Sequence, residues 1–209
     1  HGTLGGAPVV LARSGVGKVA AAATAAVLAQ RVGAIIMVGT AGGLGEGVNP
    51  GDVVVADSLL QHDIDARPLF PRWELGGFSS FTPDPALTAL LTTAADEVLL
   101  RPRSDRGGLA ELGITSPRRH TGLIVSGDQF IATRAASDAL RSELPKALAV
   151  EMEGAALAQV CQAAGVPFAV ARTVSDRADD DAHLDFPRFL AAVAAPYARD
   201  IVLRALALR

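Results

Sequence analysis

The sequence is poor in cysteine, in aromatic residues and in charge of either sign. Its single cysteine, Cys161, cannot form a disulfide within the chain, and we expect a buried small hydrophobic side chain in a protein of the reducing cytoplasm. A net charge of −3 provides no basic field for nucleic-acid phosphates. No hydrophobic run approaches the roughly 18 residues of a membrane span. We therefore expect neither nucleic acid nor a membrane as a partner.

What is abundant is small aliphatic side chains. Half of the 209 residues are hydrophobic while aromatic residues make up only 4%, so alanine, valine and leucine supply most of the apolar surface. Such side chains let helices pack closely on a buried sheet, which is typical of α/β proteins. The length fits a single domain, residues 1–209. Because the chain starts at His1 without an initiator methionine, we expect it to lack a natural N-terminal strand and helix.

Short apolar runs of β type alternate with helical segments along the chain. Strands are predicted at 9–11, 34–38, 53–56, 123–125, 148–150 and 167–174, and helices at 18–31, 84–100, 135–144, 153–164 and 187–208. Residues 61–83 carry several prolines and glycines and are predicted to form a lid or interface loop. This alternation predicts a three-layer α/β fold, in which helices flank a mixed, mostly parallel central sheet and ligands bind beyond the strand ends.

Two glycine-rich segments follow predicted strands without matching the standard phosphate-binding patterns. The segment 14–18 resembles the end of a P-loop, but Ala12 stands where that motif has glycine and Val19 where it has serine or threonine. The segment 39–45, which we expect to be a loop, lacks the spacing of a dinucleotide-binding turn. A nucleotide triphosphatase is therefore not indicated, and each segment is as well explained by a structural turn as by a binding site.

Four segments together resemble one family, the 5′-methylthioadenosine/S-adenosylhomocysteine nucleosidases of the purine nucleoside phosphorylase superfamily. They are SGVGKVAAA (14–22), VGTAGGL (38–44), VSGDQFI (125–131) with AVEMEGAALAQVC (149–161), and VARTVSDRADDDAHLDF (170–186). The resemblance covers nearly the whole chain. It implies a phosphorylase/hydrolase-like fold and a homodimer that needs no cofactor and no metal. The implied reaction hydrolyses the N-glycosidic bond of methylthioadenosine, S-adenosylhomocysteine and 5′-deoxyadenosine and releases adenine, in methionine salvage and nucleoside catabolism.

The resemblance makes Asp176 the general acid that protonates N7 of the purine, so that adenine leaves neutral. The chemistry requires such a donor, because N-glycoside cleavage passes through an oxocarbenium-like state and an anionic base is a poor leaving group. A carboxyl at the end of a buried strand can keep a raised pKa. Arg172, on the same predicted strand, would orient the attacking water and neighbouring carboxylates. Without the resemblance, Asp176 would be interpreted as a loop or helix-capping aspartate.

The resemblance also implies a set of substrate-binding residues. Glu153 would accept hydrogen bonds from the ribose 2′ and 3′ hydroxyls, Met152 would pack on the sugar, and Phe130 would stack on the purine. Main-chain groups of Ile131 would contact the adenine edge. Glu151 is a competing candidate, and both glutamates could simply stabilise a helix N-terminus; core packing is an alternative for Phe130. Thr40, Ala41, Gly42 and Ser175 complete the expected base and sugar contacts.

The pocket for the 5′-alkylthio group is expected to be apolar and shared between two subunits. Val16 and Phe186 would line it, and the loop 62–73 of a second copy would add Ala66 and Leu69. The family's water-activating glutamate lies in a segment upstream of residue 1, so we expect the general base there. Because the pocket residues differ from those of the best-known members, the pocket could also accept a larger 5′ substituent, including that of a futalosine-type nucleoside.

Three alternatives remain at the level of sequence. Related phosphorylases use phosphate as the nucleophile and bind it with an arginine at the place of Met37, although Arg13 or Lys18 could supply that charge instead. A metal-dependent hydrolase could use the acidic cluster Asp176, Asp179, Asp180, Asp181 and His183, which is more typical of a solvated loop. A nucleoside-binding protein without catalytic activity would keep the pocket alone.

Overall fold

The computed structural model describes residues 1–74, 76–101, 107–178 and 186–209. In chain order the elements are β1 (Gly2–Leu4), β2 (Ala7–Val9), α1 (Lys18–Ala29), β3 (Ile35–Gly43), β4 (Val53–Gln61), α2 (Pro85–Leu100), α3 (Gly107–Glu111), β5 (Arg119–Ser126), α4 (Arg134–Glu143), β6 (Ala147–Glu151), α5 (Gly154–Ala164), β7 (Phe168–Asp176), α6 (Phe186–Phe189), the π-helical segment η2 (Leu190–Ala194) and α7 (Ala195–Ala207). None of the described helices is long and apolar enough to cross a bilayer.

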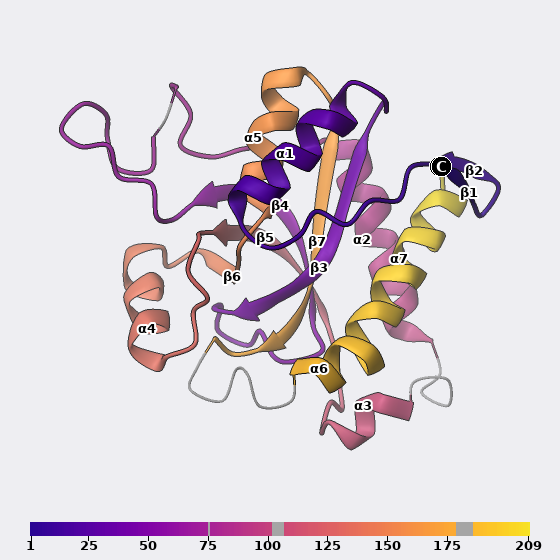
Figure 1. Ribbon diagram of the computed structural model, residues 1–209. Coiled ribbons are helices and arrows are strands. Elements are labelled where there is room, and N and C mark those ends of the chain that lie inside the picture. Colours follow the sequence, from indigo (N-terminus) through magenta and orange to yellow (C-terminus); the bar gives the residue numbers. More distant parts are fainter. Residues whose placement is uncertain (75, 102–106, 179–185) are drawn as a thin grey trace.

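Five strands form a sheet that closes on itself in the order β3-β6-β5-β4-β7. The pairs β3/β7, β4/β5 and β5/β6 are parallel, while β3/β6 and β4/β7 are antiparallel. Helices α1 and α5 pack together on one side of this barrel and α2 and α7 on another (Figure 1). The prediction of an α/β fold with a mixed, mostly parallel sheet between helices is confirmed, and the structure adds the closure of the sheet.

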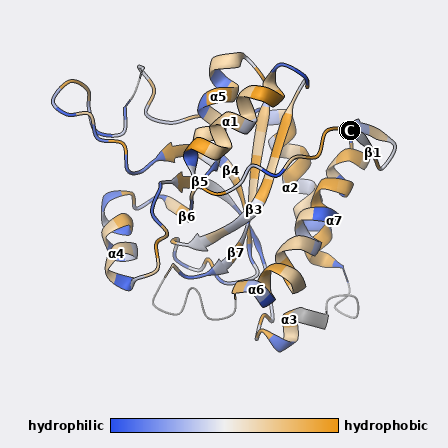
Figure 2. Ribbon diagram, in the orientation of Figure 1, coloured by the Kyte–Doolittle hydropathy of each residue, from blue (hydrophilic) through white to orange (hydrophobic). Residues whose placement is uncertain are grey.

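The strands are apolar because most of them are covered on both faces. Along β4, Val54 packs in the cluster beneath α1 and α5, whereas Val53 and Val55 pack in the cluster beneath α2 and α7. All three valines are fully buried, and each such side chain contributes roughly 1.5–3 kcal/mol to stability. Figure 2 shows the middle of β3 and β7 in hydrophobic colours and their arrowheads in more polar ones. Polar chemistry is therefore concentrated at the carboxyl ends of these two strands.

Helix ends follow the local sequence signals. Asp84 caps α2 by accepting a hydrogen bond from the Leu87 amide at 2.9 Å, with Pro85 in the first turn. Gly165 ends α5 in the left-handed conformation, at φ 66°. Both ends agree with the predicted boundaries. The strand predicted at 9–11 overlaps β2 only at Val9 and is wrong for residues 10–11. β1 and the short α3 were not predicted, because three to five residues carry too little periodicity to be recognised.

The prediction that residues 39–45 form a loop is wrong for most of that segment, because β3 runs on to Gly43. The glycines make room for a side chain of the neighbouring strand β7 and for the residues that follow that strand, rather than forming a turn. A Cβ atom at Gly39 would lie 2.0 Å from Nη1 of Arg172, and one at Gly42 would lie 2.9 Å from Cβ of Ala178. β4 is also longer than predicted and ends at Gln61. Both strands thus reach the region where the candidate site residues lie.

Candidate active site

Arg172 is a buried cation between strands β3 and β7, among the candidate site residues. It lies on β7, opposite Gly39 in the parallel register with β3, and its side chain is 4% exposed. Its Nη2 atom forms ion pairs with the carboxylates of Glu151 and Glu153 and contacts Sδ of Met37 at 3.5 Å. A guanidinium has a rigid planar fork, so two carboxylate partners fix its orientation. The predicted association of Arg172 with neighbouring carboxylates is thus present.

Glu151 uses its carboxylate entirely within the protein. The side chain is 2% exposed and ends β6. It accepts hydrogen bonds from the Ser126 hydroxyl, from the amides of Glu153 at 3.0 Å and Gly154 at 2.8 and 2.9 Å, and from Arg172. Because a carboxylate has about four acceptor sites, these four donors occupy it fully. Glu151 therefore fixes the start of α5 and the position of Arg172, and it has no capacity left for a ligand.

Glu153 is placed differently. It directly precedes α5 and its side chain is 13% exposed. One oxygen accepts a hydrogen bond from the Gly17 amide at 2.9 Å, and the other lies 3.3 Å from Nη2 of Arg172. Of about four acceptor sites, these contacts use two, so one lone pair on each oxygen can accept from a ligand. Two adjacent acceptors of this kind match a vicinal diol. Of the two glutamates considered from the sequence, the geometry favours Glu153 for the sugar.

Asp176 lies at a β-bulge at the end of β7. Ala41 pairs with Val174 but Gly42 pairs with Asp176, so Ser175 is an extra residue in the ladder. The Ser175 hydroxyl lies 2.5 Å from Oδ2 of Asp176 and 3.3 Å from the carbonyl oxygen of Ala41. The amide of Ala178 donates to Oδ1 at 2.7 Å. The bulge turns the half-buried carboxyl away from strict strand alternation and holds it in a defined orientation.

The predicted base-binding residues follow β5. Ile131 is 8% exposed and packs in one hydrophobic cluster with Leu44 and Ala178, which links the predicted adenine-binding segment to the turn that follows Asp176. Phe130 is 58% exposed, so packing in the core does not account for this ring. Thr40 is half-buried on β3 next to the buried Ala41.

A charged cluster that the sequence alone does not predict joins the start of α1 to the loops that follow β4 and β5, beside Glu153. Nζ of Lys18 lies 2.7 Å from Asp63 and 3.8 Å from Asp128, whose own amide donates to Asp63 at 2.9 Å. Oδ1 of Asp128 also accepts from the Lys18 amide at 3.0 Å. Burial alone would raise the pKa of Asp63, but the hydrogen bonds from Lys18 and Asp128 lower it overall. Lys18 and Asp128 were within the matching segments, but their pairing depends on loops far apart in sequence.

The residues expected around the 5′ substituent are not gathered by this single chain. Val16 is 77% exposed and Leu69 is 82% exposed. Ala66 and Met152 are half-buried, and Phe186 is half-buried at the start of α6. Residues 62–74 belong to a loop that projects from the barrel (Figure 1).

The metal-site alternative gains no support from the described part of the chain, where His, Cys, Asp and Glu form no group of three placed to bind an ion. Asp179, Asp180, Asp181 and His183 lie outside the described residues.

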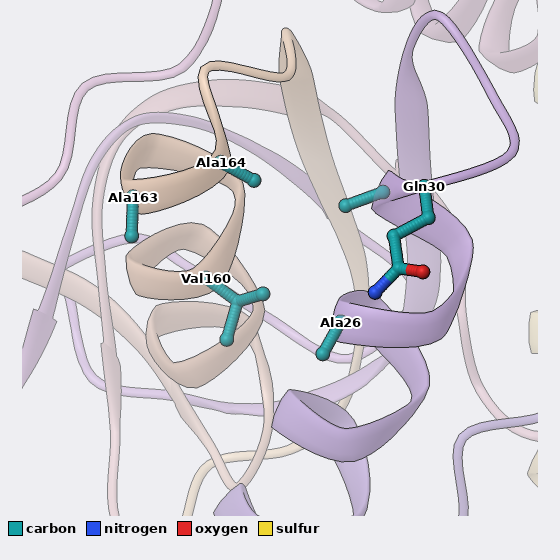
Figure 3. Close-up of a pocket in the computed structure, with 6 residues that line it drawn as sticks. Ala26, Gln30, Val160, Ala163 and Ala164 are labelled. Carbon is teal, nitrogen blue, oxygen red and sulfur yellow. The ribbon is translucent and has the colours of Figure 1, made fainter.

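A shallow hollow lies between α1 and α5, away from the helix ends that carry Gly17 and Glu153. Its lining consists of Ala26, Ala29, Gln30, Val160, Ala163 and Ala164. In Figure 3, Ala26 and Val160 face each other across it. These residues are one amide and five alkyl side chains, with no acid or base among them. The hollow is therefore separate from the candidate active site.

The chain is similar over its length to known proteins of one family. Residues 1–207 match the model of the phosphorylase superfamily. A 5′-methylthioadenosine/S-adenosylhomocysteine nucleosidase of Neisseria meningitidis, solved with methylthio-immucillin-A, is 32% identical, with a TM-score of 0.84 over 100% of this chain and 84% of that one. The corresponding nucleosidase of Streptococcus pneumoniae, solved with a transition-state inhibitor, is 33% identical, with a TM-score of 0.79 over 98% and 83%.

A futalosine hydrolase mutant of Helicobacter pylori is also similar. It is 33% identical, with a TM-score of 0.70 over 90% of this chain and 77% of that one. Proteins that act on different nucleosides thus match at nearly the same identity, so the resemblance establishes the family and not the substrate. The chain belongs to the phosphorylase superfamily of enzymes that act on nucleosides, and over its whole length it is similar in structure to the methylthioadenosine/S-adenosylhomocysteine nucleosidases.

Proposed function

We propose that this protein hydrolyses the N-glycosidic bond of 5′-methylthioadenosine and S-adenosylhomocysteine. The observation that carries the proposal is the difference between its two neighbouring glutamates. Glu151 is saturated by four internal donors, whereas Glu153, beside Arg172, keeps one acceptor site on each oxygen. A ribose with free 2′ and 3′ hydroxyls supplies the two missing donors. The nucleosidases solved with methylthio-immucillin-A and with a transition-state inhibitor support the choice of substrate.

In this mechanism Asp176 donates a proton to N7 of the purine as the bond between C1′ and N9 breaks. The electron pair of that bond leaves with the adenine, which departs neutral, and positive charge develops on the ribose. The carboxylate of Glu153 beside the sugar stabilises this charge. The oxygen of water adds to C1′ and loses a proton to a base. Arg172 orients the water and the carboxylates.

Water is the proposed nucleophile because the cations near the sugar are already paired with carboxylates. Arg172 pairs with Glu151 and Glu153, and Lys18 pairs with Asp63 and Asp128. Phosphate would have to compete with these four acidic side chains. Met37, at the place where related phosphorylases carry an arginine, contributes a thioether against Arg172 instead of a charge. Arg13 is exposed to solvent.

We further propose that the enzyme acts as a homodimer. Val16, Leu69 and Phe130 are large apolar side chains that this chain leaves 58–82% exposed. Exposed apolar groups beside a binding site favour a surface that another molecule covers. A second copy that brings its loop 62–73 over Val16 would complete an apolar pocket suited to a thioether.

The test is release of adenine from methylthioadenosine by the full-length protein in phosphate-free buffer. Hydrolysis yields methylthioribose, and added phosphate leaves the product unchanged. Appearance of the ribose 1-phosphate would instead establish phosphorolysis. Turnover should be compared for methylthioadenosine, S-adenosylhomocysteine, 5′-deoxyadenosine and a futalosine-type nucleoside, and the proposal requires one of the first two to give the highest kcat/KM. Activity that survives a chelator would exclude the metal-dependent alternative.

A further inference from the structure

Arg141, on α4, binds the backbone of both strand ends next to Asp176. Its Nε atom donates to the carbonyl oxygen of Leu44 at 2.8 Å. Its Nη2 atom lies 3.5 Å from the carbonyl oxygen of Gly43 and 3.4 Å from the carbonyl oxygen of Arg177. Its Nη1 atom forms an ion pair with Asp138 at 3.0 Å, one turn earlier on the same helix. The side chain is 34% exposed, so these contacts are partly shielded from water. One guanidinium thus joins the end of β3 to the residue that follows β7.

The bonded carbonyl groups flank the candidate acid. Arg177 lies between Asp176 and Ala178, whose amide holds Oδ1 of the acid. Ala178 is fully buried with φ 53°, a conformation that alanine adopts rarely and that its surroundings must enforce. Across from this turn, a Cβ atom at Gly42 would stand 3.1 Å from Oδ1 of Asp176. A small movement of either strand end would therefore reorient the carboxyl group.

The same helix is also tied to the predicted adenine-binding segment. Thr133 caps α4 two residues after Ile131. Ile131, which precedes α4, packs in one cluster with Ala178 and with Leu140 of that helix. The polar contacts of Arg141 and this apolar cluster therefore connect α4, the segment that would hold the base, and the turn that holds the acid.

We propose that Arg141 is a positioning residue for general acid catalysis, which keeps the carboxyl of Asp176 aligned with N7 of the purine. The inference rests on the proposed function. A helix-borne guanidinium suits this purpose because it can bind several carbonyl oxygens at once without becoming deprotonated. Misplacement of a catalytic group by about 1 Å can cost on the order of 100-fold in rate. Loss of Arg141 should therefore reduce catalysis although the side chain itself does not touch the nucleoside.

The test compares two substrates in the full-length enzyme. Methylthioadenosine needs a proton on its leaving group, whereas the p-nitrophenyl glycoside of 5-methylthioribose releases a phenolate that is stable without protonation. In Arg141→Met we expect kcat for methylthioadenosine to fall about 10- to 100-fold, with little change in KM, while kcat for the p-nitrophenyl glycoside falls less than about threefold. Arg141→Lys, which keeps a donor and the charge, should restore part of the loss.

Arg199→Met is the matched control, because Arg199 is an exposed arginine of α7 that pairs with Asp200. It should leave both substrates unaffected. An equal loss on both substrates in Arg141→Met, or no loss on either, would overturn the positioning role while leaving the proposed function intact. Failure of the parent enzyme to cleave any of the adenine nucleosides would instead remove the proposed function, and this inference with it. If Arg141→Met does not fold, the same substrate ratio measured in Arg141→Lys decides the question.

Discussion

Arg172 lies so close to Gly39 that a Cβ atom at position 39 would stand 2.0 Å from its Nη1 atom and 3.2 Å from its Cζ atom. The contact joins the two parallel strands β3 and β7 where they carry the candidate site. The backbone of β3 approaches the guanidinium so closely that only glycine fits at position 39. The sulfur atom of Met37 contacts Nη2 of the same guanidinium at 3.5 Å. The position of the buried charge therefore depends on the absence of a side chain from the neighbouring strand.

Gly39→Ala should displace Arg172 and with it the pairing to Glu151 and Glu153. We expect kcat to fall at least about 10-fold and the free energy of unfolding to fall by about 1–3 kcal/mol, as for other overpacked sites. Adenine release and urea unfolding measure the two effects. Gly33→Ala is the control, since a Cβ atom there meets nothing within 4 Å. Equal behaviour of the two variants would contradict the proposed importance of the contact.

Asp176→Asn removes the dissociable proton but keeps the size of the side chain. If Asp176 is the general acid, adenine release from methylthioadenosine should fall by about 100- to 10,000-fold. Binding of adenine, followed by calorimetry, should change far less, because the amide can still hydrogen-bond to the ring. A variant that cleaves methylthioadenosine at the parental rate would show that another group protonates the base.

Substitution of Glu151 should mainly reduce stability, whereas substitution of Glu153 should mainly reduce activity. Glu151→Gln removes a buried charge that balances Arg172, so we expect a loss of about 3–5 kcal/mol in the free energy of unfolding. Glu153→Gln should cost less stability, because that carboxylate is partly exposed and has two internal donors, but it should raise KM for a nucleoside with both hydroxyls and lower kcat because the negative charge beside the sugar is lost. The decisive comparison is with the 2′-deoxy substrate, for which the parent enzyme should lose its advantage in KM over the Glu153→Gln variant but keep its advantage in kcat.

His62 predicts a pH dependence of stability. This residue is 7% exposed, and within the described structure its Nε2 atom has no hydrogen-bond partner. Burial lowers the pKa of His62 below 6.5, an effect that Lys18 reinforces and nearby carboxylates oppose. As the pH falls through 6.5, the unfolded chain takes up a proton that the folded chain does not, so stability is lost until the folded pKa is reached.

Urea unfolding between pH 7.5 and pH 5 should therefore show a smaller loss of stability in His62→Gln than in the parent protein. Parallel curves for the two proteins would refute the assignment to His62.

The fold class was predictable because its main signal is local. Buried apolar runs such as 167–174 and capped helices such as the one that starts at Asp84 can be recognised from spacing alone. The run 39–45 was misassigned because glycine has the same appearance in sequence whether it forms a turn or makes room for Arg172. Nothing near Gly39 in the sequence indicates a guanidinium that lies on a strand more than a hundred residues later.

The site residues also differ in how far the sequence could predict them. The roles of Glu153, Arg172 and Asp176 come from a resemblance that spans four segments, and they stay predictions. The sequence could not decide between Glu151 and Glu153, because the choice depends on how many donors surround each carboxylate. Arg141 is an ordinary helix residue in sequence. Only the fold brings it to the carbonyl groups of Leu44 and Arg177.

The closed ring of five strands has a consequence for association. An open sheet ends in edge strands whose unpaired amide and carbonyl groups can recruit a strand from another molecule. In the ring each strand has two neighbours, although β3 meets β6 at only two residue pairs and β4 meets β7 at three. The ring therefore offers fewer free edge groups than an open sheet would, which disfavours edge-to-edge pairing of the framework that carries Arg172 and Asp176.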